Sequence, residues 1–181
     1  MGGGAHAVLV PTVSVPEPTL RQIRELMDAA FAGDFSDDDW AHTIGGVHAV
    51  VADAAGAVLA HASVVARTIT VGGAAFRAGY VEGVATLPDR QGEGLGSMAM
   101  EAIAEHLRGV YQLGVLGTGE WHFYERLGWE RWQGMTWVRR AAGLERTEDD
   151  DDGIMVLRFG PSAAAELTAD IVCEERPGDV W

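Results

Sequence analysis

Three long runs of β-branched and other apolar residues, separated by short turns, constrain the fold of this chain most strongly. The runs are Val47–Ala52, Val58–Thr70 and Phe76–Thr86, and the turns between them are Asp53–Gly56 and Gly72–Gly73. Apolar runs joined by turn residues predict neighbouring antiparallel strands. The chain is therefore expected to build its core on an antiparallel meander.

Helical patterns lie on both sides of this meander. Apolar residues recur at helical spacing from Leu20 to Phe31 and again from Leu95 to about Arg108, and Ser36 is typical of the cap of a short helix. Further along, the patterns predict strands over Tyr111–Thr118, Trp132–Arg140, Ile154–Phe159 and Leu167–Cys173, a short helix over Trp121–Leu127 and a polar loop over Glu145–Gly153. This order predicts a single α+β domain over residues 1–181, with a mixed, mostly antiparallel sheet and flanking helices.

The charge excludes some partner classes. With 27 acidic residues against 13 basic ones, the 181-residue chain has a formal net charge of −14. Nucleic acids and anionic membranes are therefore poor partners, whereas cationic ligands are favoured; the alternative is that the charge only keeps the protein soluble. The single cysteine, Cys173, excludes an internal disulfide and fits a cytoplasmic protein.

The segment Arg90–Gly96 is rich in glycine and lies between a predicted strand and a predicted helix. Such a loop lets backbone N–H groups approach an anion at a helix N-terminus, so a pyrophosphate would fit there. A merely flexible turn is the alternative. The loop is neither a P-loop nor a good dinucleotide fingerprint, because no Gly-Lys-Ser/Thr follows and the preceding strands form a meander.

The pattern Gln91-x-x-Gly94-x-Gly96 after a long strand resembles the acetyl-CoA loop of the GNAT N-acetyltransferase superfamily. The resemblance implies the GNAT fold and acetyl-CoA as cosubstrate. It also implies that the Val84 N–H polarises the acetyl carbonyl, and that Tyr124 protonates the departing thiolate; a core tyrosine is the alternative. By the same resemblance, the cofactor contacts are Val84, Ala85, Thr86, Gln91, Gly92, Glu93, Gly94, Leu95 and Gly96.

A narrower resemblance covers most of the chain. The motifs are Phe31-Ala32-Gly33-Asp34-Phe35, Asp39-Trp40, His42-Thr43-x-Gly45-Gly46-x-His48, Gly79-Tyr80-Val81-Glu82-Gly83, Tyr111-Gln112-Leu113-Gly114, Asp150-Asp151-Asp152-Gly153 and Gly178-Asp179-Val180-Trp181. In this order they resemble the aminoglycoside 2′-N-acetyltransferases. The resemblance implies direct acetyl transfer to the 2′-amine of a cationic antibiotic, resistance to that antibiotic, and a homodimer.

An aminoglycoside has several ammonium groups, so carboxylates suit its binding site. The resemblance implies substrate contacts at Asp34, Asp39, Glu82, Gly83, Gly117, Asp151, Asp152, Asp179 and Trp181, the last through its α-carboxylate. It also makes Glu82 the candidate base, acting through water, with the Trp181 carboxylate as a contributor. Without the resemblance, Asp39 is typical of a first-turn helix acid, and Asp151 and Asp152 of a solvated loop.

Some residues depart from the family pattern, and other functions remain open. Gly117 stands where the family tends to have a serine that contacts the drug. A GNAT enzyme acting on a polyamine, a peptide N-terminus or a cell-wall amino sugar is one alternative, and a non-catalytic binder of cationic drugs is another. The six histidines show no zinc-type spacing, so no metal is expected.

Overall fold

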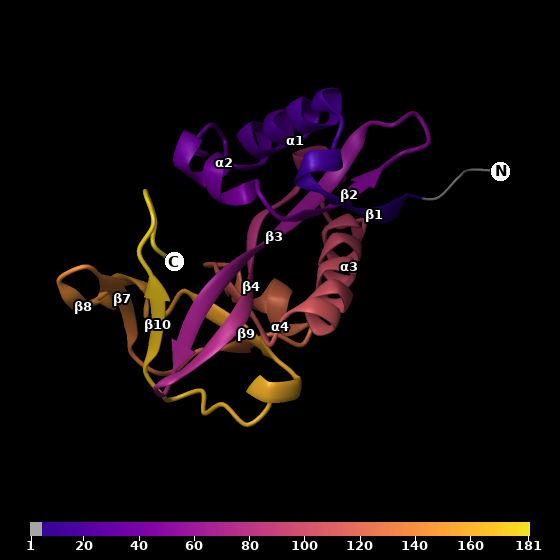
Figure 1. The fold of residues 1–181 in the computed structure, drawn as a ribbon. Coiled ribbons are helices and arrows are strands. Elements are labelled where there is room, and N and C mark those ends of the chain that lie inside the picture. The colour runs from indigo at the N-terminus through magenta and orange to yellow at the C-terminus, as the bar shows by residue number, and fades with distance from the viewer. Residues whose placement is uncertain (1–4) are drawn as a thin grey trace. The chain divides into compact units, whose positions relative to one another are not determined.

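The structure, a computed structural model, describes residues 5–181. They divide into two compact units, one containing the chain up to Val65 together with Val81–Glu105, the other Ala66–Tyr80 together with His106–Trp181. Figure 1 shows the elements in chain order. The long strands β3 (Val58–Val71) and β4 (Ala74–Thr86) contribute residues to both units.

The first unit is a small antiparallel sheet with helices. Its elements are β1 (His6–Pro11), the 3₁₀ turn η1 (Thr12–Ser14), α1 (Glu17–Ala30), α2 (Asp37–Thr43), β2 (Val47–Ala52), parts of β3 and β4, η2 (Pro88–Arg90) and most of α3 (Leu95–Val110). Strand β2 pairs antiparallel with both β1 and β3, with Val47 opposite Val64. The predicted hairpin of the second and third strands is thus confirmed.

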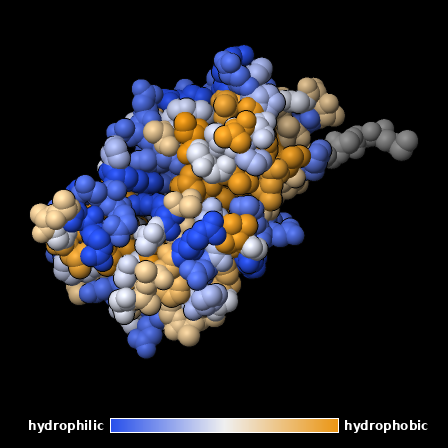
Figure 2. Space-filling model, in the orientation of Figure 1, coloured by the Kyte–Doolittle hydropathy of each residue, from blue (hydrophilic) through white to orange (hydrophobic). Residues whose placement is uncertain are grey.

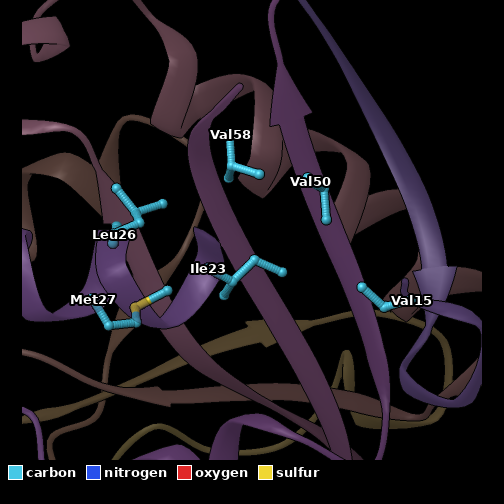
Figure 3. Packing of buried hydrophobic residues seen from close by; sticks show 7 residues of the cluster. Val15, Ile23, Leu26, Met27, Val50 and Val58 are labelled. Atoms are coloured by element: carbon cyan, nitrogen blue, oxygen red, sulfur yellow. The ribbon is translucent and has the colours of Figure 1, made fainter. Parts of the chain in front are cut away.

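The core of this unit forms between α1 and the strands. Ile23, Leu26 and Met27 are buried on one face of α1, as the helical spacing predicts. They pack with Val50 of β2 and Val58 of β3 (Figure 3). This packing holds β3 and the end of β4 in place, which matters because five of the candidate site residues of this unit, Glu82–Thr86, lie on β4.

The second unit contains the remaining parts of β3 and β4 and the C-terminal strands. Its further elements are β5 (Leu113–Gly117), α4 (Trp121–Glu125), β6 (Glu130–Arg131), β7 (Thr136–Arg140), β8 (Gly143–Arg146), η3 (Glu148–Asp150), β9 (Ile154–Arg158), η4 (Gly160–Ser162) and β10 (Ile171–Glu174). The strand order is β6-β9-β5-β4-β3-β10-β7-β8. The β4–β5 and β10–β7 pairs are parallel, and the β10–β3, β5–β9, β6–β9 and β7–β8 pairs are antiparallel. The predicted mixed, mostly antiparallel sheet is therefore confirmed.

Three predicted boundaries in this unit are wrong. One is the start of the strand expected from Leu167, which begins only at Ile171. The strand expected from Trp132 begins only at Thr136, because Gly134 packs against backbone so closely that a Cβ there would lie 1.8 Å from the Ala169 oxygen. The segment expected as a loop from Glu145 starts inside a strand, since β8 pairs antiparallel with β7. The differences at Trp132 and Glu145 arise from backbone approach and strand pairing, which local sequence patterns do not report.

The surface is mixed rather than uniformly polar. Hydrophobic and hydrophilic residues share the face seen in Figure 2. Large apolar side chains such as Val8, Val13 and Met135 are exposed. Within residues 5–181, no helix is long and apolar enough to cross a membrane.

Candidate active site

The glycine-rich loop leads into α3, and no other atoms crowd its backbone at two glycines. Gly92 and Gly94 both have φ of +83°, a conformation that favours glycine, and a Cβ at either would meet no atom within 4 Å. The Gly94 oxygen accepts the Met98 N–H at 3.0 Å, so the helical hydrogen bonds begin here. The first-turn N–H groups of a helix lack helical partners, and this loop therefore suits a pyrophosphate.

An ion pair braces the same loop. The Arg90 guanidinium donates two hydrogen bonds of 2.8 Å to the Glu93 carboxylate. Hydrogen bonding to Arg90 lowers the pKa of Glu93 below its usual range. Both side chains are partly exposed, and the pair neutralises the acid beside the loop.

Near the end of β4, Gly83 departs from regular strand geometry. Gly83 has φ of +54°, and a Cβ there would lie 2.9 Å from Thr43 Cγ2. Glycine is required at this position both by conformation and by space. From β3, Ser63 Oγ donates to the backbone carbonyl oxygen of Glu82 at 3.2 Å. His61 Nδ1 lies 2.7 Å from the backbone carbonyl oxygen of Gly83.

The other acids of the first unit have different surroundings. Asp39 Oδ2 accepts hydrogen bonds from Ser36 N and Ser36 Oγ at 2.8 and 2.7 Å, which completes the capping box of α2. Asp34 is exposed in the segment that follows α1. Asp39 thus uses its Oδ2 atom to cap α2, whereas Asp34 is exposed.

In the second unit, Tyr124 lies in the short helix α4 and is buried. Burial raises the pKa of the Tyr124 hydroxyl to about 12, although a hydrogen bond with the Thr118 side chain opposes part of this increase. The Trp129 ring meets the Tyr124 ring edge-on at 6.4 Å. The phenol therefore keeps its proton at neutral pH, as a proton donor must.

The segment after β10 is anchored through Trp181 and Arg176. The buried Trp181 ring donates Nε1–H to Thr147 Oγ1 at 2.9 Å. Arg176 donates to the Trp181 oxygen at 3.2 Å and to the Asp179 oxygen at 2.7 Å. Thr147 thus holds the Trp181 ring, and Arg176 holds one of its backbone oxygens.

Gly117, at the end of β5, lies close to Trp181 and Tyr80. A Cβ at Gly117 would lie 3.4 Å from the Tyr80 hydroxyl and 3.7 Å from the Trp181 carbonyl carbon. These are ordinary contact distances, so the space beside Gly117 admits a small side chain. The predicted contact residues Gly117 and Trp181 are therefore neighbours.

The three successive aspartates of the predicted acidic motif have distinct environments. Asp151 pairs with Arg146 at 2.8 Å and accepts from both the Thr136 N–H and hydroxyl at 2.9 and 2.8 Å. The pKa of Asp151 is lowered, mainly by its hydrogen bonds with Arg146. Asp152 is exposed. Burial, together with the negative charge of Asp179, raises the pKa of Asp150.

A carboxylate with a raised pKa beside a second carboxylate favours a cationic ligand, because the cation relieves the repulsion. The sequence motif includes Asp150 but does not mark it as a contact residue. Burial and the charge of Asp179 distinguish Asp150 from its neighbours, and neither is visible in the order of residues. Within residues 5–181, no group of three or more His, Cys, Asp and Glu side chains is arranged to hold a metal ion.

Comparison with known proteins identifies the family. The chain matches the model of the acetyltransferase (GNAT) domain over residues 14–132. It is 45% identical to the aminoglycoside 2′-N-acetyltransferase of Mycolicibacterium fortuitum, over 99% of this chain and 94% of that protein. The chain belongs to the GNAT acetyltransferase family. The predicted enzyme class and the resemblance to the aminoglycoside 2′-N-acetyltransferases are thereby confirmed.

Solved structures show the same fold as this GNAT chain. The Escherichia coli GNAT protein YhbS, solved in complex with CoA, matches with a TM-score of 0.70 at 17% identity, over 98% of this chain and 97% of that one. A GNAT acetyltransferase from Brucella melitensis, solved with acetyl-CoA, matches with a TM-score of 0.61 at 23% identity, over 92% and 94% of the two chains. The predicted GNAT fold is confirmed.

Proposed function

We propose that this GNAT enzyme transfers acetyl from acetyl-CoA directly to the 2′-amine of aminoglycoside antibiotics and so confers resistance. The observation that supports the substrate is the 45% identity, over nearly the full chain, to a protein named for this activity. The raised pKa of Asp150 beside Asp179 agrees with a polycationic substrate. A cation bound there gains from both carboxylates.

Acetyl-CoA supplies the acetyl thioester as the electrophile. The residues proposed to hold it are Val84, Ala85 and Thr86 on β4 and Gln91, Gly92, Glu93, Gly94, Leu95 and Gly96 in the loop. The left-handed glycines and the open space around them fit this role, since the backbone N–H groups of the loop are accessible.

Glu82 is the proposed base. An ammonium has no lone pair to attack a carbonyl, so its proton must leave first. The half-buried Glu82 carboxylate takes the proton of the 2′-ammonium through one or more waters, and the Trp181 carboxylate contributes. Two residues beyond Glu82 on β4, the Val84 N–H is the proposed hydrogen-bond donor to the reacting carbonyl oxygen.

Tyr124 is the proposed acid. As the new C–N bond forms and the C–S bond breaks, the Tyr124 hydroxyl, whose pKa is raised to about 12, donates its proton to the departing sulfur. The nitrogen gives up its second proton to solvent to become the amide, and solvent reprotonates Tyr124. The proposed substrate contacts are Asp34, Asp39, Glu82, Gly83, Gly117, Asp150, Asp152, Asp179 and Trp181. Asp151 acts through Arg146 and Thr136 to shape the segment on which its neighbours lie.

The test compares two aminoglycosides that differ only in bearing an amine or a hydroxyl at the 2′ position. Thiol release and product mass are measured with acetyl-CoA present. Turnover of the 2′-amine compound alone, with one acetyl group added, is expected. Turnover of both compounds would mean that another amine is the target, and turnover of neither would favour a polyamine or peptide substrate.

A further inference from the structure

Two buried histidines on β2 and β3 connect through hydrogen bonds to Gly83 of β4, and the proposed mechanism gives them no role. His48 on β2 and His61 on β3 are each fully buried. In the β2–β3 register, His48 lies opposite Ser63 and His61 opposite Val50, so the two rings are diagonal neighbours on one face. Their ring centroids are 5.1 Å apart.

Short hydrogen bonds join these rings into a chain that ends on β4. Thr12 Oγ1 lies 2.7 Å from His48 Nε2, His48 Nδ1 lies 2.8 Å from His61 Nε2, and His61 Nδ1 lies 2.7 Å from the Gly83 oxygen. All four residues belong to the first unit. Every ring nitrogen of the pair therefore has a partner.

The chemistry of the partners sets the direction of every bond. A carbonyl oxygen only accepts, so His61 Nδ1 bears the hydrogen. Burial lowers the pKa of His61 to about 3 and that of His48 to about 4, and both rings are neutral at pH 7. His61 Nε2 then accepts from His48 Nδ1–H. His48 Nε2, 2.7 Å from Thr12 Oγ1, accepts from the Thr12 hydroxyl, whose other acceptor, the Gly46 backbone oxygen, is farther away at 3.2 Å.

Thr12, the first residue of this hydrogen-bond chain, is itself fixed by backbone hydrogen bonds. The Gly45 N–H donates to Thr12 Oγ1 at 3.0 Å, and the Thr12 N–H donates to the Gly46 oxygen at 2.9 Å. A Cβ at Gly46 would lie 1.9 Å from the Val64 oxygen, so the two backbones approach too closely for any other residue. The donors of Thr12, His48 and His61 all point toward Gly83, and such aligned bonds strengthen one another.

We infer that His61, supported by His48 and Thr12, polarises the Gly83–Val84 peptide and strengthens the Val84 N–H as a hydrogen-bond donor. The Gly83 carbonyl and the Val84 N–H belong to one resonant peptide group. A hydrogen bond accepted by the carbonyl draws electron density from the nitrogen and makes its N–H more positive. No peptide is cis in the described part of the chain, so the Val84 N–H points away from His61.

This inference rests on the proposed role of the Val84 N–H toward the reacting carbonyl. His48 and His61 are positioning residues, since they touch neither substrate. The conformation of Gly83, with its positive φ, is the feature that lets its carbonyl face His61. A role in packing alone would not require donors that all point the same way.

The first measurement uses protein labelled with carbonyl-¹³C glycine and ¹⁵N valine. Only Gly–Val peptides give a carbonyl-to-nitrogen NMR correlation in such a sample; they are Gly46–Val47, Gly83–Val84, Gly109–Val110 and Gly114–Val115. In His61→Phe, which keeps the ring shape but lacks the donor, the Gly83 carbonyl signal should move upfield. In His61→Asn, whose amide nitrogen replaces Nδ1, it should stay closer to the wild-type position.

The matched control is Ser63→Ala, because Ser63 contacts the neighbouring Glu82 oxygen and not Gly83. It should leave the Gly83 carbonyl signal in place. If His61→Phe fails to fold, His48→Phe replaces it: loss of the donor to His61 Nε2 should move the Gly83 signal in the same direction by a smaller amount. An unmoved Gly83 signal in the folded histidine variants would overturn the inference.

The second measurement records acetyl-CoA labelled with ¹³C at its acetyl carbonyl, bound to each variant without any amine. The wild-type shift should lie downfield of free acetyl-CoA, and His61→Phe should reduce this difference while His61→Asn preserves most of it. With the antibiotic, kcat of His61→Phe should fall about 3- to 10-fold, less than the roughly 100-fold loss typical of deleting a whole donor, and KM should change little.

The outcomes separate this inference from the proposed function. If the bound acetyl signal responds but wild-type protein acetylates no aminoglycoside, only the substrate assignment fails. If the Gly83 signal moves while the bound acetyl signal does not, the peptide is not coupled to the thioester and the inference is wrong. A rise of KM at constant kcat in His61→Phe would also contradict it.

Discussion

The Asp151 carboxylate and the Arg146 guanidinium form a bidentate ion pair, with Nη1–Oδ1 and Nη2–Oδ2 distances of 2.9 and 2.8 Å. Paired bonds of this kind fix both side chains. Thr136 completes the arrangement with its N–H and hydroxyl. Asp151 therefore stabilises the segment between β8 and β9 rather than offering free oxygens to a ligand.

We predict that Asp151→Asn lowers the free energy of unfolding by about 1 to 2 kcal/mol at pH 7, because a charge-assisted pair is lost at a partly exposed site. The folded-state pKa of Asp151 is lowered, mainly by Arg146, so its contribution is complete above the ordinary aspartate pKa of about 4 and disappears as the pH falls below it. Urea unfolding at several pH values measures this. The exposed Asp152→Asn control should stay within about 0.5 kcal/mol of wild type.

Asp150 should behave in the opposite sense. Burial and Asp179 raise its folded-state pKa, so its contribution to stability is present below the ordinary aspartate pKa and is lost as the pH rises through the raised value. Asp150→Asn should therefore not destabilise the protein at pH 7, yet it should raise the KM for the antibiotic about tenfold, since an ionic contact is removed.

A carboxyl-¹³C NMR titration checks the cause of the Asp150 shift. Asp179→Asn should move the pKa of Asp150 downward, because the second-largest cause of its increase is removed. Asp149→Asn is the matched control and should have a smaller effect, since the Asp149 charge is a lesser cause. An equal response to both changes would contradict the pairing of Asp150 with Asp179.

Tyr124→Phe should lower kcat by about 100-fold or more while leaving the protein folded, because the phenyl ring keeps the contact with Trp129. The pKa of about 12 also predicts that ionisation of Tyr124 produces no alkaline decline of wild-type kcat in assays up to about pH 10. Steady-state kinetics across pH test both statements. Full activity of Tyr124→Phe would remove Tyr124 from the mechanism.

Gly117→Ser should be tolerated and should improve binding of the antibiotic. Its Cβ would contact the Tyr80 hydroxyl at 3.4 Å, which is an ordinary distance, so stability should change by no more than about 0.5 kcal/mol. The added hydroxyl gives the substrate a further hydrogen bond, which lowers KM.

The contrasting control for Gly117 is Gly134→Ala, whose Cβ would lie 1.8 Å from the Ala169 oxygen. It should lose several kcal/mol of stability, about 3 or more, because backbone must move. Thermal unfolding of the two variants compares them. Similar losses in both would show that the space beside Gly117 is not available to a side chain.

Much of the fold was predictable because it depends on local patterns. The spacing of Ile23 and Met27 predicts the buried face of α1, and the runs around Asp53–Gly56 predict the β2–β3 hairpin; the structure shows both. Strand ends were less predictable. The start of β7 at Thr136 depends on Gly134 packing against Ala169, two residues far apart in the sequence.

Ordered motifs also indicated the family, because catalytic loops keep residue types at set spacings. The order of residues alone was enough to predict the fold class and the family. The surroundings of individual acids became clear only in three dimensions, where Asp151 pairs with Arg146, Asp39 caps α2, and the charge of Asp179 acts on Asp150. The same holds for His48 and His61, since a hydrogen bond or a pKa shift depends on distances between atoms that the order of residues does not contain.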